Sequence, residues 1–491
     1  MKRRTFVRAA IGTAALSQPF TRLIAADKPA AADHAADKLS AQPTTIERKA
    51  LDELSRSLHG KLVLASNDEY DAVRRVWNRM IDRRPALIAQ CADAADVAHA
   101  VTFARERELL LAVRGGGHSF PGLSTCEGGM LLDLSPMKGV RVDVKARRVM
   151  AAGGAWGGHV DGECQQHDLA TTMGQISDTG IGGLTLGGGF GWLSRKHGLA
   201  CDNLVSVEVV TADGKLRRAS LDENADLFWG LRGGGGNFGV ATSFEYRLHP
   251  VSQQAIGGGM SWGVADAPAV IDFYREATAS GPRELSLDLG IWHEKDKGKV
   301  FGIEVCHTGD SAAGMKLFES MRRIGKPLSD TVRAMKYVDV QRQFDDGNVS
   351  DRYHYLKAGF VREITPAFSD YLVREYEPTS TAGIYMQNAS GAVGDVAPEA
   401  TAFWNRKNLA NLMILSAWGD PADTERNRAA VRAAWDRIEP HTSGYYVNLS
   451  DAAKSSVGGN YGANYPRLVK LKQKYDPMNL FRLNSNVSPT G

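Results

Sequence analysis

Three glycine-rich stretches between residues 114 and 240 contain the residues best suited to chemistry. The first stretch reads Arg-Gly-Gly-Gly-His-Ser over residues 114–119. Glycines leave consecutive backbone N–H groups unobstructed, and such groups can form a concave nest that binds a pyrophosphate. His118 lies inside this stretch, so its imidazole would be held beside whatever the loop binds. The stretch therefore predicts an anion-binding loop with a histidine in it.

The second stretch, residues 177–191, holds seven glycines in fifteen residues, and the third, residues 233–240, leads into a strand. A chain so rich in glycine is floppy unless a ligand or a close backbone contact orders it. One such stretch alone could be an ordinary turn. Three of them within about 125 residues favour loops that share a ligand.

A Rossmann dinucleotide site is the first alternative to consider. That site needs Gly-x-Gly-x-x-Gly to follow a strand and open a helix. The first stretch is instead followed by Pro121-Gly122, which ends a helix, and the second follows glycine-rich sequence and no clear buried strand. Neither stretch therefore fits a Rossmann fold well.

The ordered motifs together resemble the berberine-bridge-enzyme-like family, whose FAD-binding fold is of the vanillyl-alcohol-oxidase type. The stretch at 114–119 resembles the family's flavin-attachment motif, and residues 178–193 resemble its second FAD loop. Further matches lie at residues 201–204, 235–240, 461–468 and 475–481. These matches keep their order over nearly the whole chain after its first 80 residues.

The resemblance implies FAD bonded covalently through His118 to the flavin 8α carbon. A bonded imidazole withdraws electron density from the flavin and should favour hydride uptake. The residues implied to bind the cofactor are Arg114, Gly115, Gly116, Gly117, His118, Ser119, Thr179, Gly180, Gly182, Gly183, Gly187, Gly188, Gly189, Gly191, Val240 and Asn484. No metal site is expected.

Two positions depart from the family pattern. Many relatives attach FAD a second time through a cysteine in the second loop, and that position falls near Ile176 here. We therefore expect a single covalent link, and a bulky oligosaccharide substrate becomes a weaker expectation. At residues 484–486 the chain reads Asn-Ser-Asn where relatives more often carry a central Gln, which puts that cofactor contact in doubt.

The resemblance implies a tyrosine base near the last strand of the substrate domain, and Tyr446 falls at the best-matching position. A tyrosine needs a nearby cation or flavin to lower its pKa from about 10 before it can act as a base. A structural role in the sheet is an equally good interpretation. Tyr385, Gln387 and Tyr353 are further candidates for the substrate pocket.

The elements that must position these residues indicate an α+β fold. Residues 80–250 mix strands with a few helices: we expect strands at 85–89, 109–113, 130–134, 140–152, 204–211 and 240–248. Residues 251–440 alternate strands (286–292, 299–307, 412–418) with helices (267–277, 312–324, 424–438), which predicts an antiparallel sheet covered by helices. The expected organisation is an export signal and linker at 1–45, an FAD-binding domain at 46–250, a substrate domain at 251–445, and a segment at 446–491 that returns to the FAD domain.

Composition and the N-terminus bound the remaining possibilities. The net charge of +3 and the lack of a long basic block disfavour a nucleic-acid partner, and no apolar run beyond the leader predicts a membrane span. The five cysteines form no metal-binding spacing, so buried thiols are expected.

Arg3-Arg4 followed by Thr5-Phe6 and an Ala-rich stretch resembles a twin-arginine signal and predicts a periplasmic protein. The alternatives are a general secretory signal and a basic start with no targeting role.

The expected function is an FAD-dependent oxidoreductase. A small-molecule alcohol or sugar-type substrate would give hydride to the flavin, and molecular oxygen would accept the electrons and form hydrogen peroxide. Two alternatives stay open: a dehydrogenase that uses another electron acceptor, and a flavin-carrying binding protein without catalysis. Nothing in the middle domain names the substrate, because Trp262, Trp292, Trp404 and Trp418 suit core packing better than sugar stacking.

Overall fold

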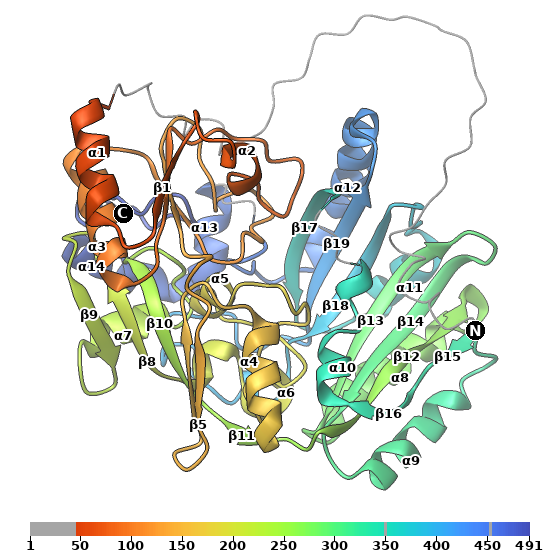
Figure 1. The fold of residues 1–491 in the computed structure, drawn as a ribbon. Coiled ribbons are helices and arrows are strands. Elements are labelled where there is room, and N and C mark those ends of the chain that lie inside the picture. Colours follow the sequence, from red (N-terminus) through yellow and green to blue (C-terminus); the bar gives the residue numbers. More distant parts are fainter. Residues whose placement is uncertain (1–45, 348–350, 451–453) are drawn as a thin grey trace, which may run out of the picture.

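The computed structural model describes residues 46–347, 351–450 and 454–491 (Figure 1). The export signal and linker predicted at 1–45 lie outside the described residues. Within the described ranges no helix has both the length and the apolar character needed to cross a bilayer. The predicted α+β class is confirmed, because three large sheets and one two-stranded sheet are combined with helices in the described residues.

The first sheet has four strands in the order β1-β2-β4-β3, and the first glycine-rich stretch leaves its edge strand β3. β2, β4 and β3 run parallel, and β1 pairs antiparallel with β2. Helix α3 packs on this sheet, and at its N-terminus the Asp93 carboxylate accepts hydrogen bonds from the amides of Ala95 and Asp96. The strands are β1 (Lys61–Leu64), β2 (Leu87–Gln90), β3 (Leu111–Arg114) and β4 (Met130–Asp133).

The second sheet has five antiparallel strands in the order β5-β6-β10-β8-β9. The single strand predicted over 140–152 is wrong: the chain turns at residues 144–147, where Arg147 has a φ of 50°, and forms a hairpin. The strands are β5 (Val140–Asp143), β6 (Arg148–Ala152), β8 (Leu204–Val210), β9 (Leu216–Ser220) and β10 (Val240–Arg247); the short pair β7 (Leu169–Ala170) and β11 (His249–Pro250) lies apart from them.

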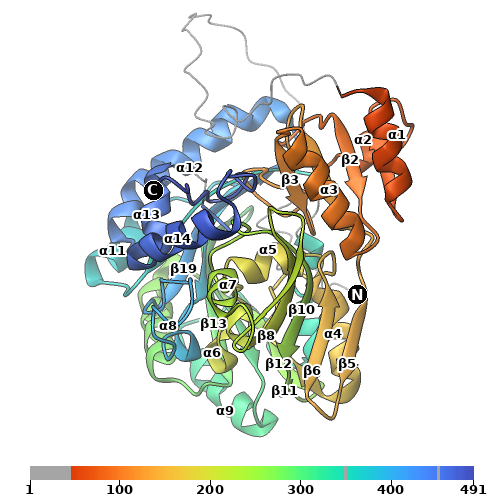
Figure 2. The same ribbon diagram turned by 90° about the vertical axis from the view of Figure 1, so that its left-hand side faces the viewer.

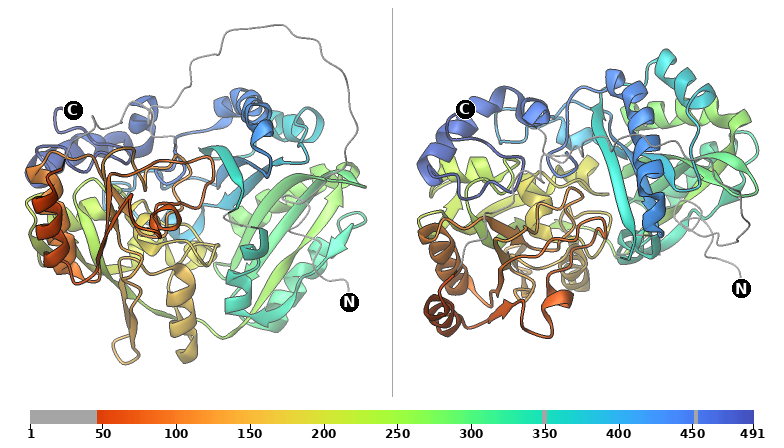
Figure 3. Two further views of the ribbon diagram at one scale, coloured as in Figure 1. Left: turned by 45° about the horizontal axis from the view of Figure 1, so that its top comes forward. Right: turned by 90° about the horizontal axis from the view of Figure 1, so that it is seen from above.

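The third sheet has eight antiparallel strands and is built from residues after 253 (Figures 1 and 3). Its main path is β15-β12-β14-β13-β18-β19-β17, and β16 also pairs with β12. The strands are β12 (Gln254–Gly263), β13 (Leu285–Glu294), β14 (Gly298–His307), β15 (Ser329–Asp330), β16 (Arg333–Lys336), β17 (Tyr353–Val361), β18 (Ala382–Asn388) and β19 (Ala410–Trp418).

The two faces of the eight-stranded sheet have different chemistry, because side chains alternate between faces along a strand. On one face Leu287, Leu289 and Ile291 of β13 pack against helices α8 and α12 in an apolar core. On the other face the same strand carries Asp288 and Trp292. The second face is turned toward the FAD-binding half of the chain.

Most of the helices flank the sheets, and the last ones bring the chain back to its first half (Figure 2). α14 packs on α7, and the buried Lys472 ammonium donates to the carbonyl of Asn237 in the third glycine-rich stretch at 2.9 Å. The helices are α1 (Arg48–Ser57), α2 (Tyr70–Val73), α3 (Ala94–Glu106), α4 (Gly157–Cys164), α5 (Ile181–Leu186), α6 (Ser194–His197), α7 (Ala225–Leu231), α8 (Ala267–Ser280), α9 (Ser311–Arg322), α10 (Tyr337–Gln341), α11 (Pro366–Arg374), α12 (Thr424–Ile438), α13 (Lys454–Tyr461) and α14 (Tyr465–Tyr475).

Candidate functional site

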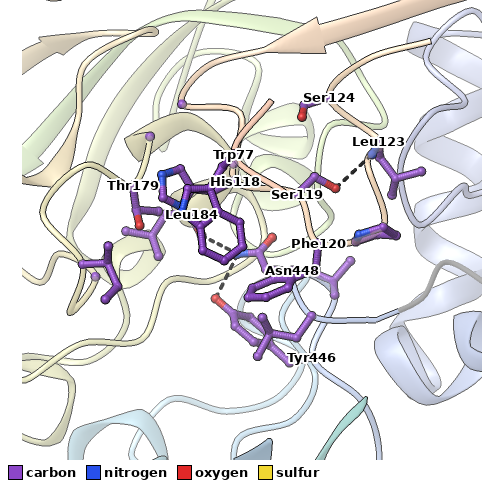
Figure 4. Close-up of a pocket in the computed structure, with 18 of the residues that line it drawn as sticks. Trp77, His118, Ser119, Phe120, Leu123, Ser124, Thr179, Leu184, Tyr446 and Asn448 are labelled. Atoms are coloured by element: carbon purple, nitrogen blue, oxygen red, sulfur yellow. Dashed lines mark hydrogen bonds between the residues drawn. The ribbon is translucent and has the colours of Figure 1, made fainter. Parts of the chain in front are cut away.

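A cavity of about 560 Å³ lies where the glycine-rich stretches meet the second face of the eight-stranded sheet. Its walls come from all three stretches, from β13, β14, β18 and β19, and from residues 446–450 and 481–485. Figure 4 shows the part of the cavity around His118 and Tyr446. The three glycine-rich stretches, which lie far apart in the sequence, therefore meet at one space.

The first glycine-rich stretch presents a row of unpaired amides at this cavity. Within the described residues, no amide N–H of residues 115–119 donates a hydrogen bond to another protein group. Gly117 is buried and its four neighbours in the stretch are partly exposed where they line the cavity, so these free N–H groups are available to an acceptor bound there. This is the arrangement that the predicted anion-binding nest requires.

The first and second stretches lie back to back. A Cβ added to Gly116 would lie 2.3 Å from the amide nitrogen of Gly180, and one added to Gly180 would lie 2.2 Å from the amide nitrogen of Gly116. Real Cβ atoms do not approach backbone so closely, so both positions must be glycine. The two loops thereby form one continuous glycine surface beside the cavity.

Most of the predicted cofactor-binding residues line the cavity. These are Gly115, Gly116, Gly117, His118, Ser119, Thr179, Gly180, Gly182, Gly183, Val240 and Asn484. The Asn484 amide nitrogen donates to the carbonyls of Gly236 and Phe481, whereas its buried oxygen has no hydrogen-bond partner. Asn484 therefore offers an acceptor atom to a ligand.

Arg114, predicted to bind the cofactor, does not line the cavity. Its guanidinium makes a buried bidentate ion pair with Asp133 (3.0 and 2.7 Å) and donates to the carbonyls of Val73 and Arg75. All of this hydrogen bonding is directed away from the ligand space. Arg114 thereby holds the start of the glycine-rich stretch in place.

Gly187, Gly188, Gly189 and Gly191, which were also predicted to bind the cofactor, lie outside the cavity wall. Gly188 and Gly189 have φ values of 126° and 91°, which side chains rarely allow. A Cβ on Gly191 would lie 1.7 Å from the carbonyl oxygen of Met173. These glycines are required by the tight turn and close packing behind the cavity.

His118 occupies the centre of the site. Its Nε2 lies 3.2 Å from a carboxylate oxygen of Asp178 in the second stretch, and its ring stacks on Trp77 with centroids 5.3 Å apart. The side chain is 17% exposed and lines the cavity (Figure 4). The imidazole is thus oriented by two contacts and reachable by a ligand.

No cysteine lines the cavity. All five cysteines lie among the described residues, and all are buried free thiols, as expected. Ile176, near which the second attachment position was predicted to fall, lines the cavity wall.

The Tyr446 hydroxyl lies at the cavity wall and accepts hydrogen bonds from the Gly189 amide (3.0 Å) and the Asn448 side chain (2.9 Å). These donors would stabilise a phenolate, but burial outweighs them and raises the pKa of Tyr446 to about 12. No lysine or arginine among the described lining residues could lower it. The assignment of Tyr446 as the base stays a prediction, and its surroundings do not favour it.

A second hydroxyl on the cavity wall has a carboxylate beside it. Tyr385 of β18 donates to Asp288 at 2.5 Å, and Asp288 also accepts from the Gln175 side chain (2.6 Å) and the Asn388 amide (2.8 Å). Burial raises the pKa of Asp288 to about 6, and these hydrogen bonds limit the rise, so the carboxylate is ionised at neutral pH. Burial and the charge of Asp288 raise the pKa of Tyr385 well above its usual value, so Tyr385 can take up a proton from a ligand only while it passes its own to Asp288.

Tyr385 and Gln387 were predicted from the sequence as pocket candidates, whereas Gln175 and Asp288 were not. The Gln387 amide donates to the Gln175 oxygen at 2.8 Å, which ties the FAD-binding half to the sheet. A signal for Asp288 was present, because an aspartate interrupts an otherwise apolar strand over 285–292. Tyr353 does not line the cavity; it stacks on Trp418.

Comparison with known proteins agrees with the geometry. The family model described as FAD binding domain matches residues 85–220, and the one described as berberine and berberine like matches residues 445–488. An FAD-linked oxidoreductase of Bacillus subtilis is 30% identical, with 88% of this chain and 97% of that protein covered. The (R)-6-hydroxynicotine oxidase of Paenarthrobacter nicotinovorans is also 30% identical, with 89% and 98% covered.

The solved structures extend this likeness to the fold. The crystal structure of 6-hydroxy-D-nicotine oxidase from Arthrobacter nicotinovorans matches with a TM-score of 0.79 at 27% identity, covering 88% of this chain and 98% of that one. The fold and the site thus define an FAD-linked oxidoreductase with a vanillyl-alcohol-oxidase type FAD-binding fold. The chain belongs to the berberine-bridge-enzyme-like family of these enzymes.

The residues present fit FAD. The unpaired amides of 115–119 suit the pyrophosphate, and the free oxygen of Asn484 suits a donor on the cofactor. The glycine contact between residues 116 and 180 lets backbone approach the ligand without side chains between.

Proposed function

We propose that this enzyme oxidises a small-molecule alcohol with FAD joined covalently to His118, and that molecular oxygen is the final electron acceptor. The observation that carries the proposal is the placement of His118 in the cavity wall, inside the row of unpaired amides. Bound FAD would supply the chemistry of accepting hydride from the substrate carbon and passing two electrons on to oxygen, which yields hydrogen peroxide.

A single covalent link is proposed. His118 is held at the cavity by Asp178 and Trp77, whereas the second loop offers only Ile176 and no thiol there. With one link through an imidazole, the flavin would stay on the protein after denaturation but would be lost in a His118→Ala variant.

The proposal assigns proton removal to Tyr385 and Asp288. Tyr385 would accept the substrate hydroxyl proton while its own proton moves to the Asp288 carboxylate 2.5 Å away. Gln175 and the Asn388 amide fix the carboxylate in place. General-base assistance of this kind contributes about 10²–10⁴-fold to rate.

The lining of the cavity favours a compact substrate with an apolar body. The strand β19 presents Met413, Leu415 and Ala417 to the cavity, and Trp292 and Phe344 complete that wall. A sugar chain would need more hydrogen-bonding side chains than these provide. A small aromatic or aliphatic alcohol suits this wall better than an oligosaccharide.

A peroxide assay tests the function. The purified holoprotein is mixed with a panel of small alcohols, and flavin bleaching without oxygen and peroxide formation with oxygen are both recorded. Bleaching together with peroxide supports an oxidase. Bleaching without peroxide would replace the oxygen step with another acceptor, and a flavin that no compound bleaches would contradict the catalytic proposal.

Export by the twin-arginine route to the periplasm is also proposed, from Arg3-Arg4 and the apolar stretch that follows. The route accepts folded proteins, which suits a chain that carries a cofactor. Cell fractionation of the wild type and an Arg3→Lys, Arg4→Lys variant tests it: the variant should stay in the cytoplasm, and periplasmic recovery of the variant would contradict the proposal.

A further inference from the structure

Glu304 of β14 is a buried acid without a partner in the wall of the cavity. Its side chain faces the cavity, and the residue is 9% exposed. In the described part of the chain the carboxyl group makes no hydrogen bond and no ion pair. Buried carboxyl groups are normally paired or hydrogen-bonded, because leaving one without a partner is costly. Glu304 therefore has an unfilled bonding capacity directed at the ligand.

The sheet is built to make room for this carboxyl group. A Cβ added to Gly259 of β12, the cross-strand neighbour of Glu304, would lie 2.6–2.7 Å from the carboxyl atoms. The Glu304 side chain thus lies over Gly259. Asp288 is its cross-strand neighbour on the other side, on β13. The carboxyl group leans away from the second acid and into a space that only glycine leaves open.

The electrostatic character of the cavity follows from these two acids. Glu304 is the one carboxylic acid among the described lining residues, and no lysine or arginine joins it there. Burial raises the pKa of Glu304 to about 8, and the nearby Asp288 adds to the rise. A cation placed beside Glu304 would relieve both effects, whereas an anion would worsen them.

The rest of the lining suits a cation with an apolar body. The rings of Trp77, Phe120, Trp292, Phe344 and Tyr385 line the same cavity. Aromatic faces attract ammonium groups, most strongly where water is excluded. The acid and the rings therefore favour the same ligand chemistry.

We propose that Glu304 binds a cationic nitrogen on the substrate, so that the enzyme acts on amine-bearing alcohols. This inference rests on the proposed function for the identity of the reacting group and adds the class of molecule that carries it. The ammonium group pairs with the Glu304 carboxylate, and the apolar body of the substrate packs against the rings.

The position of Glu304 indicates that the substrate nitrogen is bound for recognition and takes no part in the reaction. Tyr385 lies on β18, and β13 separates this strand from β14. Neighbouring strands are about 4.8 Å apart, so roughly 10 Å separates the two backbone positions. The nitrogen held by Glu304 is therefore several bonds away from the carbon oxidised near Tyr385, and the reaction leaves it unchanged.

A binding experiment without turnover tests this proposal. The holoprotein is titrated calorimetrically at pH 8.5 with benzyltrimethylammonium, with its neutral isostere neopentylbenzene, and with benzenesulfonate. The wild type should bind the cation about ten-fold or more tightly than the neutral compound and should not bind the anion. Glu304→Gln should lose the preference for the cation while it still binds the neutral compound.

Two further variants secure the interpretation. Glu304→Asp keeps the negative charge and should keep part of the preference for the cation. This variant keeps the proposal testable if Glu304→Gln fails to fold. Glu294→Gln is the matched control, because Glu294 ends β13 and pairs with Lys297 outside the cavity wall. It should bind the cation as the wild type does.

Either of two results would overturn the proposal: no cation preference in the wild type, or the same preference in Glu304→Gln. Neither readout depends on turnover or on the covalent link. A protein that forms peroxide but shows no cation preference would refute Glu304 as the anchor alone. A protein that binds the cation but oxidises no alcohol would refute the proposed function alone.

Discussion

Gly116 and Gly180 lie so close that a methyl group on either residue would come within 2.3 Å of the other's amide nitrogen. Gly116→Ala must therefore separate the two glycine-rich loops at the cavity. We expect destabilisation of about 1–3 kcal/mol, as for other overpacked sites, together with loss of flavin from the purified protein. The flavin-to-protein absorbance ratio and thermal unfolding measure both effects.

Gly162→Ala is the control for this substitution, since a Cβ there meets nothing within 4 Å in helix α4. It should keep full flavin content and gain a little helix stability. Full flavin loading of Gly116→Ala would show that the contact between the loops does not shape the binding site.

The buried ion pair of Arg114 and Asp133 should support both stability and cofactor binding. Replacing Arg114 by leucine leaves Asp133 buried without its partner, which we expect to cost about 3–5 kcal/mol. Arg426→Ala, at an exposed side chain, should change the free energy of unfolding by less than about 0.5 kcal/mol. Chemical denaturation measures the difference, and equal stability of the two variants would argue against the positioning role of Arg114.

The same pair predicts an acid-sensitive component of stability. Burial alone would raise the pKa of Asp133, but the hydrogen bonds and charge of Arg114 outweigh it and hold the pKa below its usual value. The stabilisation is therefore present above about pH 4 and is lost as the pH falls through the lowered pKa. Asp133→Asn should remove this part of the acid dependence, as measured by unfolding between about pH 2 and pH 5.

Two tyrosine substitutions decide between the candidates for the proton acceptor. Tyr385→Phe should lower kcat by about 10²-fold or more, because it removes the hydroxyl that connects substrate and Asp288. Tyr446→Phe should cost about 1–3 kcal/mol of stability by leaving the Gly189 amide unpaired, with only a small change in kcat. The opposite result, a large kcat loss in Tyr446→Phe alone, would restore the base predicted from the sequence.

Stability should fall as the pH rises from 5 to 9. Burial raises the pKa of Asp288 to about 6, of Asp161 to about 7 and of Glu304 to about 8. Folded protein therefore binds protons that unfolded protein has released, and this stabilisation is lost as the pH passes through the raised values. Thermal unfolding across this range should show a smaller fall for Glu304→Gln than for Glu294→Gln or the wild type. Parallel curves for all three proteins would count against the buried state of Glu304.

The glycine-rich stretches were predictable from sequence because their requirement is local. Three clusters of bare backbone in order, one with a histidine inside it, indicate a shared ligand from the residue pattern alone. The sequence did not show which of these glycines line the cavity and which pack behind its wall. Gly180 lines the cavity and Gly191 packs on Met173, although both belong to the same stretch.

The substrate face of the large sheet was harder to predict because its strands pair across long sequence distances. Strand β12 was not predicted, because its glycines at 257–259 weaken the alternating pattern that indicates a strand. Asp288 and Glu304 stand opposite each other only through the register of β13 and β14. That register, and with it the pair of acids, follows from the folded sheet and not from the spacing of the residues.

The most direct measurement of the central claim is the mass of the peptide that contains His118. We expect this peptide, from digested wild-type holoprotein, to carry the mass of FAD or its hydrolysed flavin fragment on the histidine, with no flavin on any other peptide. A peptide of unmodified mass from yellow, fully loaded protein would contradict the account, because the flavin would then be held without the bond that His118 is placed to form.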